Sequence, residues 1–225
     1  SYQNYSFQSV FQAYFQFCTQ DLSSFYFDIR KDVLYCDPEN SLKRRATLKV
    51  LDILFFKLTT WFSPILPFTM EEVYLERFPE DGNSVHLLDI PSNEKDWFNP
   101  EHVNHWDKIR NVRRVVTGAI EVLRQDKVIG SSLEACPIIY IKDKELFDII
   151  KSVDMSEVCI TSSINVEFSP TSIADGCFAL DDVPDVGVIC KTAQGKKCQR
   201  CWTLNLPIDK SEGDDLCDRC KQAVN

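Results

Sequence analysis

Four cysteines near the end of the sequence have the spacing of a metal site. They form two Cys-x-x-Cys pairs, Cys198/Cys201 and Cys217/Cys220, separated by fifteen residues. A two-residue insert lets both sulfurs of a pair turn towards one ion, and two such pairs complete a tetrahedron. Because protein ligands would fill all four positions, the spacing predicts one structural Zn²⁺ per chain rather than a catalytic ion. Two disulfides, or one redox-active pair, are the competing interpretations.

The residues around the first pair suggest what the ion supports. Arg200 lies inside this pair and Trp202 follows it. A segment of about 35 residues buries little core, so metal binding is expected to fold it, around Leu204, Leu206, Ile208 and Leu216. A partly exposed Trp202 beside Arg200 would suit the binding of an unpaired base. Packing of Trp202 against the first pair as core is the alternative, and the residues alone leave both open.

Charge is distributed unevenly along the chain. The net charge of the 225 residues is −9, but residues 126–190 alone carry 12 acidic and 4 basic groups. Basic clusters lie elsewhere, and binding to phosphates depends on such local patches more than on totals. For the cluster at residues 43–45, a solvated helix end without RNA contacts is the alternative. The clusters are Lys43-Arg44-Arg45, Lys108/Arg110/Arg113/Arg114 and Lys196/Lys197/Arg200.

The N-terminal segment and the other cysteines indicate the compartment. The first 20 residues lack charge, but Asn4 and Gln8, Gln12, Gln16 and Gln20 recur every four residues. This is a polar stripe on an amphipathic helix and not a signal peptide or a membrane span. The six other cysteines have no paired spacing, which predicts reduced, mostly buried thiols in a cytoplasmic protein.

Apolar periodicity predicts a helical N-terminal half. A helix is expected over 3–20 with one apolar face, and 21–37 should be a short helix or an extended segment. A central helix over 41–62 follows, then one begun by a Thr69-x-x-Glu72 capping box. Another should run from Asn99 as N-cap to about residue 125. The expected apolar face over 3–20 comprises Phe7, Val10, Phe11, Tyr14, Phe15 and Cys18.

The period then changes to that of a small α+β unit. Strands are expected at 138–141 and 186–190, with one or two more within 157–168 and a helix at 144–152. The fold class is therefore mainly α: a helical bundle, a small α+β domain and a zinc-binding module. The expected domains are 1–92, 93–190 and 191–225. No phosphate-binding glycine loop or catalytic triad is suggested by the sequence, so these residues predict a binding unit rather than a self-contained enzyme.

Four phrases of the sequence resemble the C-terminal part of bacterial isoleucyl-tRNA synthetase, a class I synthetase. Residues 21–37 (DLSSFYFDIRKDVLYCD) resemble the start of its anticodon-binding bundle, and 61–72 (WFSPILPFTMEE) is shared with the valine enzyme. Residues 130–135 (GSSLEA) and the terminal Cys-x-Arg-Cys-Trp complete the likeness, which covers nearly the whole chain. A valine enzyme would end in a coiled coil instead.

The resemblance implies a role in binding tRNA(Ile) at its anticodon. The family's His-Ile-Gly-His-like and Lys-Met-Ser-Lys-Ser-like signatures are absent. The chain would therefore be an inactive, monomeric fragment, while the rest of the parent synthetase binds ATP and attaches isoleucine. Arg200 and Trp202 fall where the family reads an anticodon base, and the expected backbone contacts are Arg44, Arg45, Arg110, Arg113 and Arg114. A stand-alone zinc-ribbon module for DNA or a protein partner is the alternative.

Overall fold

The computed structural model describes residues 2–92, 97–173, 175–206 and 215–224. The chain forms two compact units, Ser1–Phe98 and Asn99–Asn225. The expected division into 1–92, 93–190 and 191–225 stays a prediction. Within the described residues, no helix is long and apolar enough to cross a bilayer.

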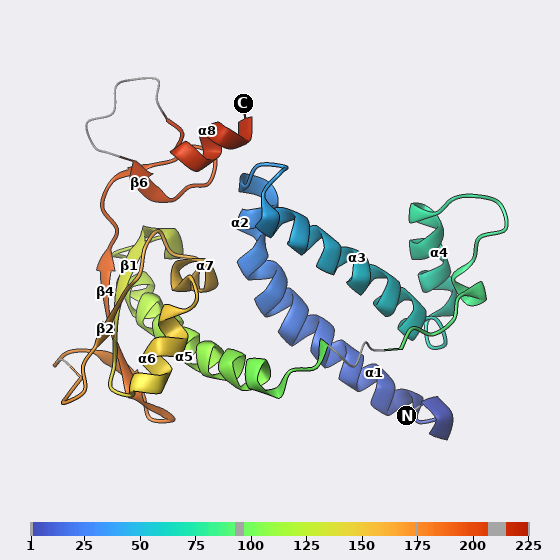
Figure 1. Ribbon diagram of the computed structural model, residues 1–225, viewed down its shortest axis with the longest axis horizontal. Helices are drawn as coiled ribbons and strands as arrows, with labels where there is room; N and C mark the ends of the chain where they lie inside the picture. The colour runs from blue at the N-terminus through green and yellow to red at the C-terminus, as the bar shows by residue number, and fades with distance from the viewer. Residues whose placement is uncertain (1, 93–96, 174, 207–214, 225) are drawn as a thin grey trace. The chain divides into compact units, whose positions relative to one another are not determined.

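The first unit begins with a nearly unbroken helical rod (Figure 1). After a 3₁₀ turn at Tyr2–Asn4 (η1), it comprises α1 (Phe7–Gln16), a π-helical segment η2 (Phe17–Phe27) and α2 (Asp28–Cys36). Of the two expectations for residues 21–37, the helix is confirmed and the extended segment is wrong. The rod ends at Asp37, whose ψ of 152° is the extended value favoured before a proline.

The apolar residues expected on one face of the first helix differ in burial. Val10 is buried, but Phe7, Phe11 and Phe15 are exposed, Phe15 by 56%. Phe11 and Phe15 instead stack on each other with ring centroids 5.9 Å apart. Val10 is therefore the buried member of this face, while the three phenylalanines remain largely open to solvent.

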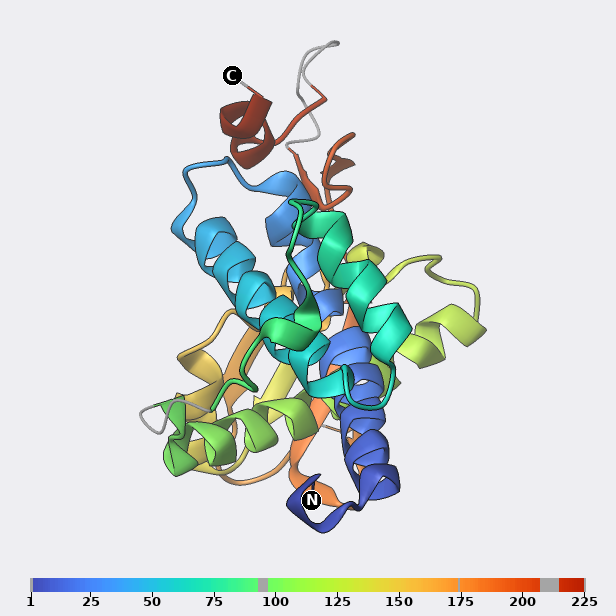
Figure 2. The ribbon, with the colours of Figure 1, turned by 90° about the vertical axis from the view of Figure 1, so that its right-hand side faces the viewer.

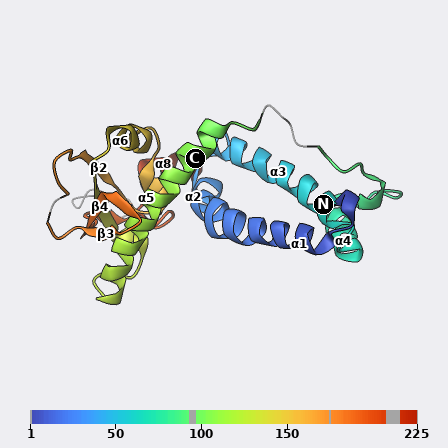
Figure 3. The same ribbon diagram turned by 90° about the horizontal axis from the view of Figure 1, so that it is seen from below.

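Helix α3 (Leu42–Phe62) runs back from the turn after α2, and the two helices are in contact (Figure 3). It begins where expected, with Ser41 as N-cap. Tyr14 of α1 stacks on Trp61 near its end, with ring centroids 5.5 Å apart. The helix contacts α2 and α4, yet Leu48 is 49% exposed. The most buried positions of α3 are therefore three threonines, Thr47, Thr59 and Thr60, rather than its large apolar side chains.

Helix α4 (Pro67–Arg77) begins before the expected capping box at Thr69, so this prediction is wrong. Pro67 occupies the first turn and Leu66 is the N-cap, so Thr69 already lies inside the helix. The fixed φ of proline favours this earlier start. Glu71, next to the acid of the predicted box, accepts hydrogen bonds from Ser84 Oγ at 2.9 Å and the backbone N of Val85 at 2.8 Å. It thereby anchors the 3₁₀ turn η3 (Val85–Leu87) to α4.

The second unit is built on α5 (Pro100–Gln125) and a four-stranded sheet. The Asn99 side chain caps α5 as expected. The strands are β1 (Ala135–Ile141), β2 (Asn165–Phe168), β3 (Phe178–Leu180) and β4 (Val183–Thr192), in the order β2-β1-β4-β3. Only the β1–β2 pair among these is parallel. Helix α5 packs on β1, β3 and β4, and buries Val112, Val115 and Val116.

Two short helices complete the α+β part. Helix α6 (Lys144–Lys151) was expected, but α7 (Met155–Cys159) occupies the first part of a segment predicted as strand. Asp154 explains the difference, because its side chain accepts hydrogen bonds from the backbone N of Ser156 and Glu157 and caps α7. The 3₁₀ turn η5 (Ser132–Glu134) leads into β1.

The chain ends in a small module of a hairpin and a helix. Strands β5 (Lys196–Lys197) and β6 (Leu204–Leu206) pair antiparallel, and α8 (Asp218–Val224) lies beside them (Figures 1 and 2). The first cysteine pair forms the turn of the hairpin, and the second lies at the start of α8. This arrangement brings together residues that are some twenty positions apart in the sequence.

Candidate metal centre and nucleic-acid interface

The four predicted cysteines converge at one point. The sulfurs of Cys198, Cys201, Cys217 and Cys220 all lie within 4.8 Å of one another, and all four residues are buried. Cys201 Sγ and Cys217 Sγ are 3.7 Å apart. This separation is too long for a disulfide, whose sulfurs are about 2.05 Å apart. The cysteines are free thiols, so the disulfide interpretation is wrong.

Backbone hydrogen bonds shape the first cysteine pair into a tight turn. The Cys198 N donates to Thr203 O, and the Trp202 N donates to Cys198 O, both at 2.9 Å. The second pair is attached through Gln199 N, which donates to Asp215 O at 2.9 Å, and through Cys217 N, which donates to Cys198 Sγ at 3.4 Å. These hydrogen bonds bring the two cysteine pairs together, and the sulfur separations suit four ligands of one ion.

The electrostatics of the cluster fit thiolate ligands around a cation. Desolvation raises the pKa of Cys198, but hydrogen bonds from the backbone of Cys201, Cys217 and Arg200 outweigh it and lower the pKa to about 6. Desolvation raises the pKa of Cys217 and Cys220, and their neighbour Cys201 adds to the effect. Four crowded sulfurs cannot all ionise without a compensating positive charge, so the donor set suits a soft divalent metal such as zinc.

Trp202 projects from this turn with much of its surface open. The residue is 58% exposed, which agrees with the first of the two interpretations, and its φ of +66° lies in the left-handed region that residues other than glycine rarely occupy. Lys197 Nζ lies 5.4 Å from the centroid of its ring. Trp202 is therefore not core, and the packing interpretation is wrong. The sequence places Lys197 in a basic cluster, but no local pattern predicts that a residue five positions before Trp202 reaches its indole.

Arg200 is half-buried in the same turn. Its side chain forms a hydrogen bond with Cys220, which opposes the rise in the pKa of that thiol. The guanidinium thus lies close to the sulfur cluster. Of the expected small core, Leu204 and Leu216 are half-buried, and Ile208 lies outside the described residues.

Ser162 connects the metal module to the 3₁₀ turn η5, which precedes the sheet. The Ser162 hydroxyl donates to Leu133 O and accepts from Leu204 N, the latter at 2.8 Å. Leu133 belongs to the phrase at residues 130–135, where Glu134 Oε2 accepts from Gly130 N at 2.8 Å. This phrase is therefore a structured turn that supports the metal module, a role that the sequence did not reveal for Ser162.

The predicted phosphate-binding arginines differ in their surroundings. Arg45 is exposed, while Arg44 Nη1 donates to Asp37 O at 3.0 Å, at the end of α2. Arg113 Nε donates to Val158 O at 2.9 Å, and Arg114 forms an exposed 2.8 Å ion pair with Asp182. Arg110 is half-buried. Arg44, Arg113 and Arg114 therefore make contacts within the protein, and their predicted contacts with the RNA backbone stay a prediction.

The six remaining cysteines are reduced thiols, as expected, but only some of them are buried. Cys36 and Cys159 are buried, while Cys18, Cys136, Cys177 and Cys190 are half-buried. Desolvation raises the pKa of Cys159 to about 12 and that of Cys190 to about 11. These two thiols stay protonated at neutral pH and are poor nucleophiles.

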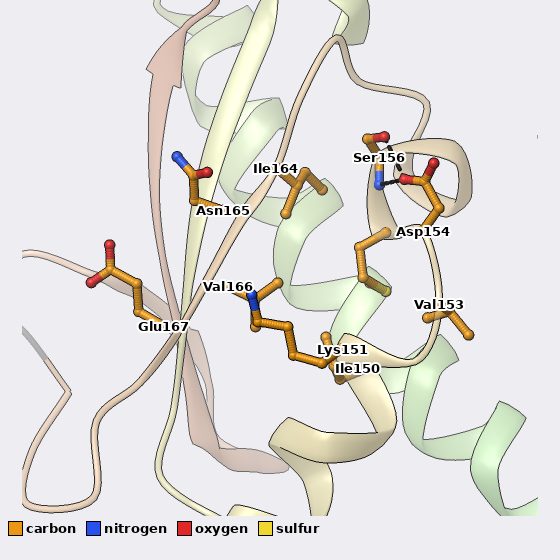
Figure 4. A pocket seen from close by; sticks show the side chains of 10 residues that line it. Ile150, Lys151, Val153, Asp154, Ser156, Ile164, Asn165, Val166 and Glu167 are labelled. Carbon is orange, nitrogen blue, oxygen red and sulfur yellow. Dashed lines mark hydrogen bonds between the residues drawn. The ribbon is translucent and has the colours of Figure 1, made fainter.

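A pocket of about 340 Å³ opens between β2 and the α6–α7 turn. Figure 4 shows Ile164 and Val166 on its inner side, while Asn165 and Glu167 point away from it. The carboxylate of Asp154 at its rim is engaged by the backbone N and hydroxyl of Ser156. The residues that line this pocket offer no convergent set of catalytic groups.

Comparison with known proteins places these features in a family. Residues 1–140 match the family described as the anticodon-binding domain of tRNA ligase. The isoleucine–tRNA ligase of Ruegeria pomeroyi is 48% identical over 99% of this chain, and that of Agrobacterium fabrum is 47% identical over 92%. The Brucella abortus protein of the same name is 46% identical over 92%.

These relatives are much longer than the chain, which spans only 23%, 21% and 21% of their lengths, respectively. The family match covers well over half of this chain and includes the helical first unit. The chain therefore belongs to the family of anticodon-binding domains of tRNA ligases.

Proposed function

We propose that the chain is the tRNA(Ile)-binding part of an isoleucine–tRNA ligase. The observation that carries this proposal is the joining of an anticodon-binding domain to a four-cysteine module that presents Trp202 and Arg200. The named relatives, similar over 92–99% of the chain, support the choice of isoleucine. The fragment acts as a monomer in the cytoplasm, joined to the rest of the parent synthetase.

Zinc is the ion proposed for the four thiols. It would be held by Cys198, Cys201, Cys217 and Cys220, and would supply the folding energy that this small module lacks. The backbone of the cysteine turn then presents Trp202 to solvent before any RNA arrives. The unpaired bases of an anticodon can be stacked on such a ring, while the donors of Arg200 suit the acceptor edge of a guanine.

The clustered cations are assigned to the phosphate backbone. Arg44, Arg45, Arg110, Arg113 and Arg114 would set the position of the RNA without reading its sequence. The parent enzyme, and not this fragment, would bind ATP and attach isoleucine.

Binding to the isolated anticodon stem-loop of tRNA(Ile) tests the proposal. In a filter-binding assay, the fragment should prefer this stem-loop to a stem-loop with a scrambled anticodon and to random duplex DNA. A stand-alone zinc-ribbon module for DNA would instead bind the duplex DNA more tightly than either stem-loop. Equal binding to all three nucleic acids would contradict the proposal, since only charge would then be recognised.

A further inference from the structure

Lys197 and Trp202 form a contact that the proposed base-reading site does not use. Lys197 ends β5, Trp202 follows the cysteine turn, and the ammonium lies 5.4 Å from the ring centroid. A cation over an indole face is attracted by the ring quadrupole, and tryptophan is the strongest partner of this kind. Because Trp202 is 58% exposed, few packing contacts hold its ring, and this one gains importance.

We propose that Lys197 is a positioning residue for base recognition: it fixes the indole of Trp202 and covers one face, so that a single unpaired base stacks on the other. This role rests on the proposed function of Trp202. A side chain that is ordered before binding loses less conformational entropy when the RNA arrives. The hairpin register supports it, because Lys197 pairs with Leu204, which places the lysine and Trp202 at the same end of the β5–β6 ladder.

A direct contact between Lys197 and a phosphate is the competing role, and the two differ in measurable ways. A phosphate contact weakens as salt rises and does not require Trp202. Positioning acts only through Trp202. The loss of RNA affinity in Lys197→Ala should therefore persist at high salt, and there should be no such loss when the indole has already been removed.

A double-mutant cycle on the zinc-loaded chain separates these roles. The dissociation constant for the anticodon stem-loop of tRNA(Ile) is measured for Lys197→Ala, Trp202→Ala and the double variant, at low and high salt. Lys197→Ala should weaken binding about two- to fivefold at both salt concentrations. It should cost nothing further in the Trp202→Ala background. Lys197→Arg, which keeps a cation able to stack on the indole, should retain the affinity of the unmodified chain. Lys196→Ala, on the same strand, is the matched control.

A second measurement detects the environment of the Trp202 ring in the absence of RNA. With 5-fluorotryptophan incorporated, the ¹⁹F resonance of Trp202 is identified among the four tryptophans by its absence in Trp202→Phe. It should shift in Lys197→Ala but not in Lys196→Ala, with zinc content unchanged in both. An unshifted resonance, or losses of affinity that add in the double variant, would overturn the positioning role. Unchanged affinity in Trp202→Ala is a different result, which would refute base stacking on Trp202 and the role of Lys197 with it, while the preference for the stem-loop tests the proposed function separately.

Discussion

Trp202 and Arg200 are expected to contribute differently to recognition. Stacking of a base on an aromatic ring contributes about 1–3 kcal/mol, so Trp202→Ala should weaken binding of the anticodon stem-loop roughly 5- to 150-fold. A bidentate contact to a base edge discriminates by a similar amount, so Arg200→Lys should reduce base preference more than affinity. Measuring zinc content and stem-loop affinity on the same variants checks both. Loss of zinc in Trp202→Ala, with intact base preference in Arg200→Lys, would contradict the assignment.

Arg113 should matter for stability as well as for RNA. Its Nε donates to the carbonyl of Val158 in α7, so Arg113→Ala leaves that acceptor without this donor. A loss of about 1–3 kcal/mol in the free energy of unfolding is expected. Arg114→Ala is the matched control, because its ion pair with Asp182 is exposed and such pairs contribute about 0–1 kcal/mol. Urea denaturation compares the two, and equal stabilities would mean that the Arg113 contact is unimportant.

At the scale of elements, the metal module should fold only with its ion. Cys217→Ser removes one thiolate from the cluster, and segments this small are unfolded without metal. We expect loss of bound zinc and of amide protection in β5, β6 and α8, while α1–α5 stay helical. Cys36→Ser, at a buried thiol outside the cluster, should retain zinc. Metal analysis and hydrogen exchange provide the measurements, and full protection of α8 in a zinc-free variant would contradict this dependence.

The elements also show what the sequence could and could not predict. Capping side chains and cysteine spacing are local signals, and they correctly predicted the start of α5 at Asn99 and the four-sulfur cluster. The start of α4 was misplaced because two local signals competed, and the proline at position 67 prevailed over the capping box at Thr69. The exposure of Phe15, the hydrogen bonds of Ser162 and the contact of Lys197 depend on partners that no local pattern encodes.

For the whole molecule, RNA binding and catalysis should be separable. The chain spans about a fifth of the length of its relatives and lacks the signature motifs of nucleotide binding. We therefore expect no isoleucine-dependent exchange of pyrophosphate into ATP, even in preparations that bind the stem-loop. A full-length relative is the positive control. Exchange by the fragment alone would show that it carries an active site that its sequence does not reveal.

The backbone conformation of Trp202 implies a compromise between folding and recognition. A positive φ costs a residue with a side chain about 1–2 kcal/mol, and glycine avoids this cost. Trp202→Gly and Trp202→Ala lose the same ring, but only glycine relieves the backbone, so the glycine variant should resist denaturation better by about 1 kcal/mol. Equal stability of the two variants would argue against such a cost. If the glycine variant is the more stable, the tryptophan is retained at this turn despite the stability it sacrifices, which is the trade-off expected when a position is selected for binding rather than for folding.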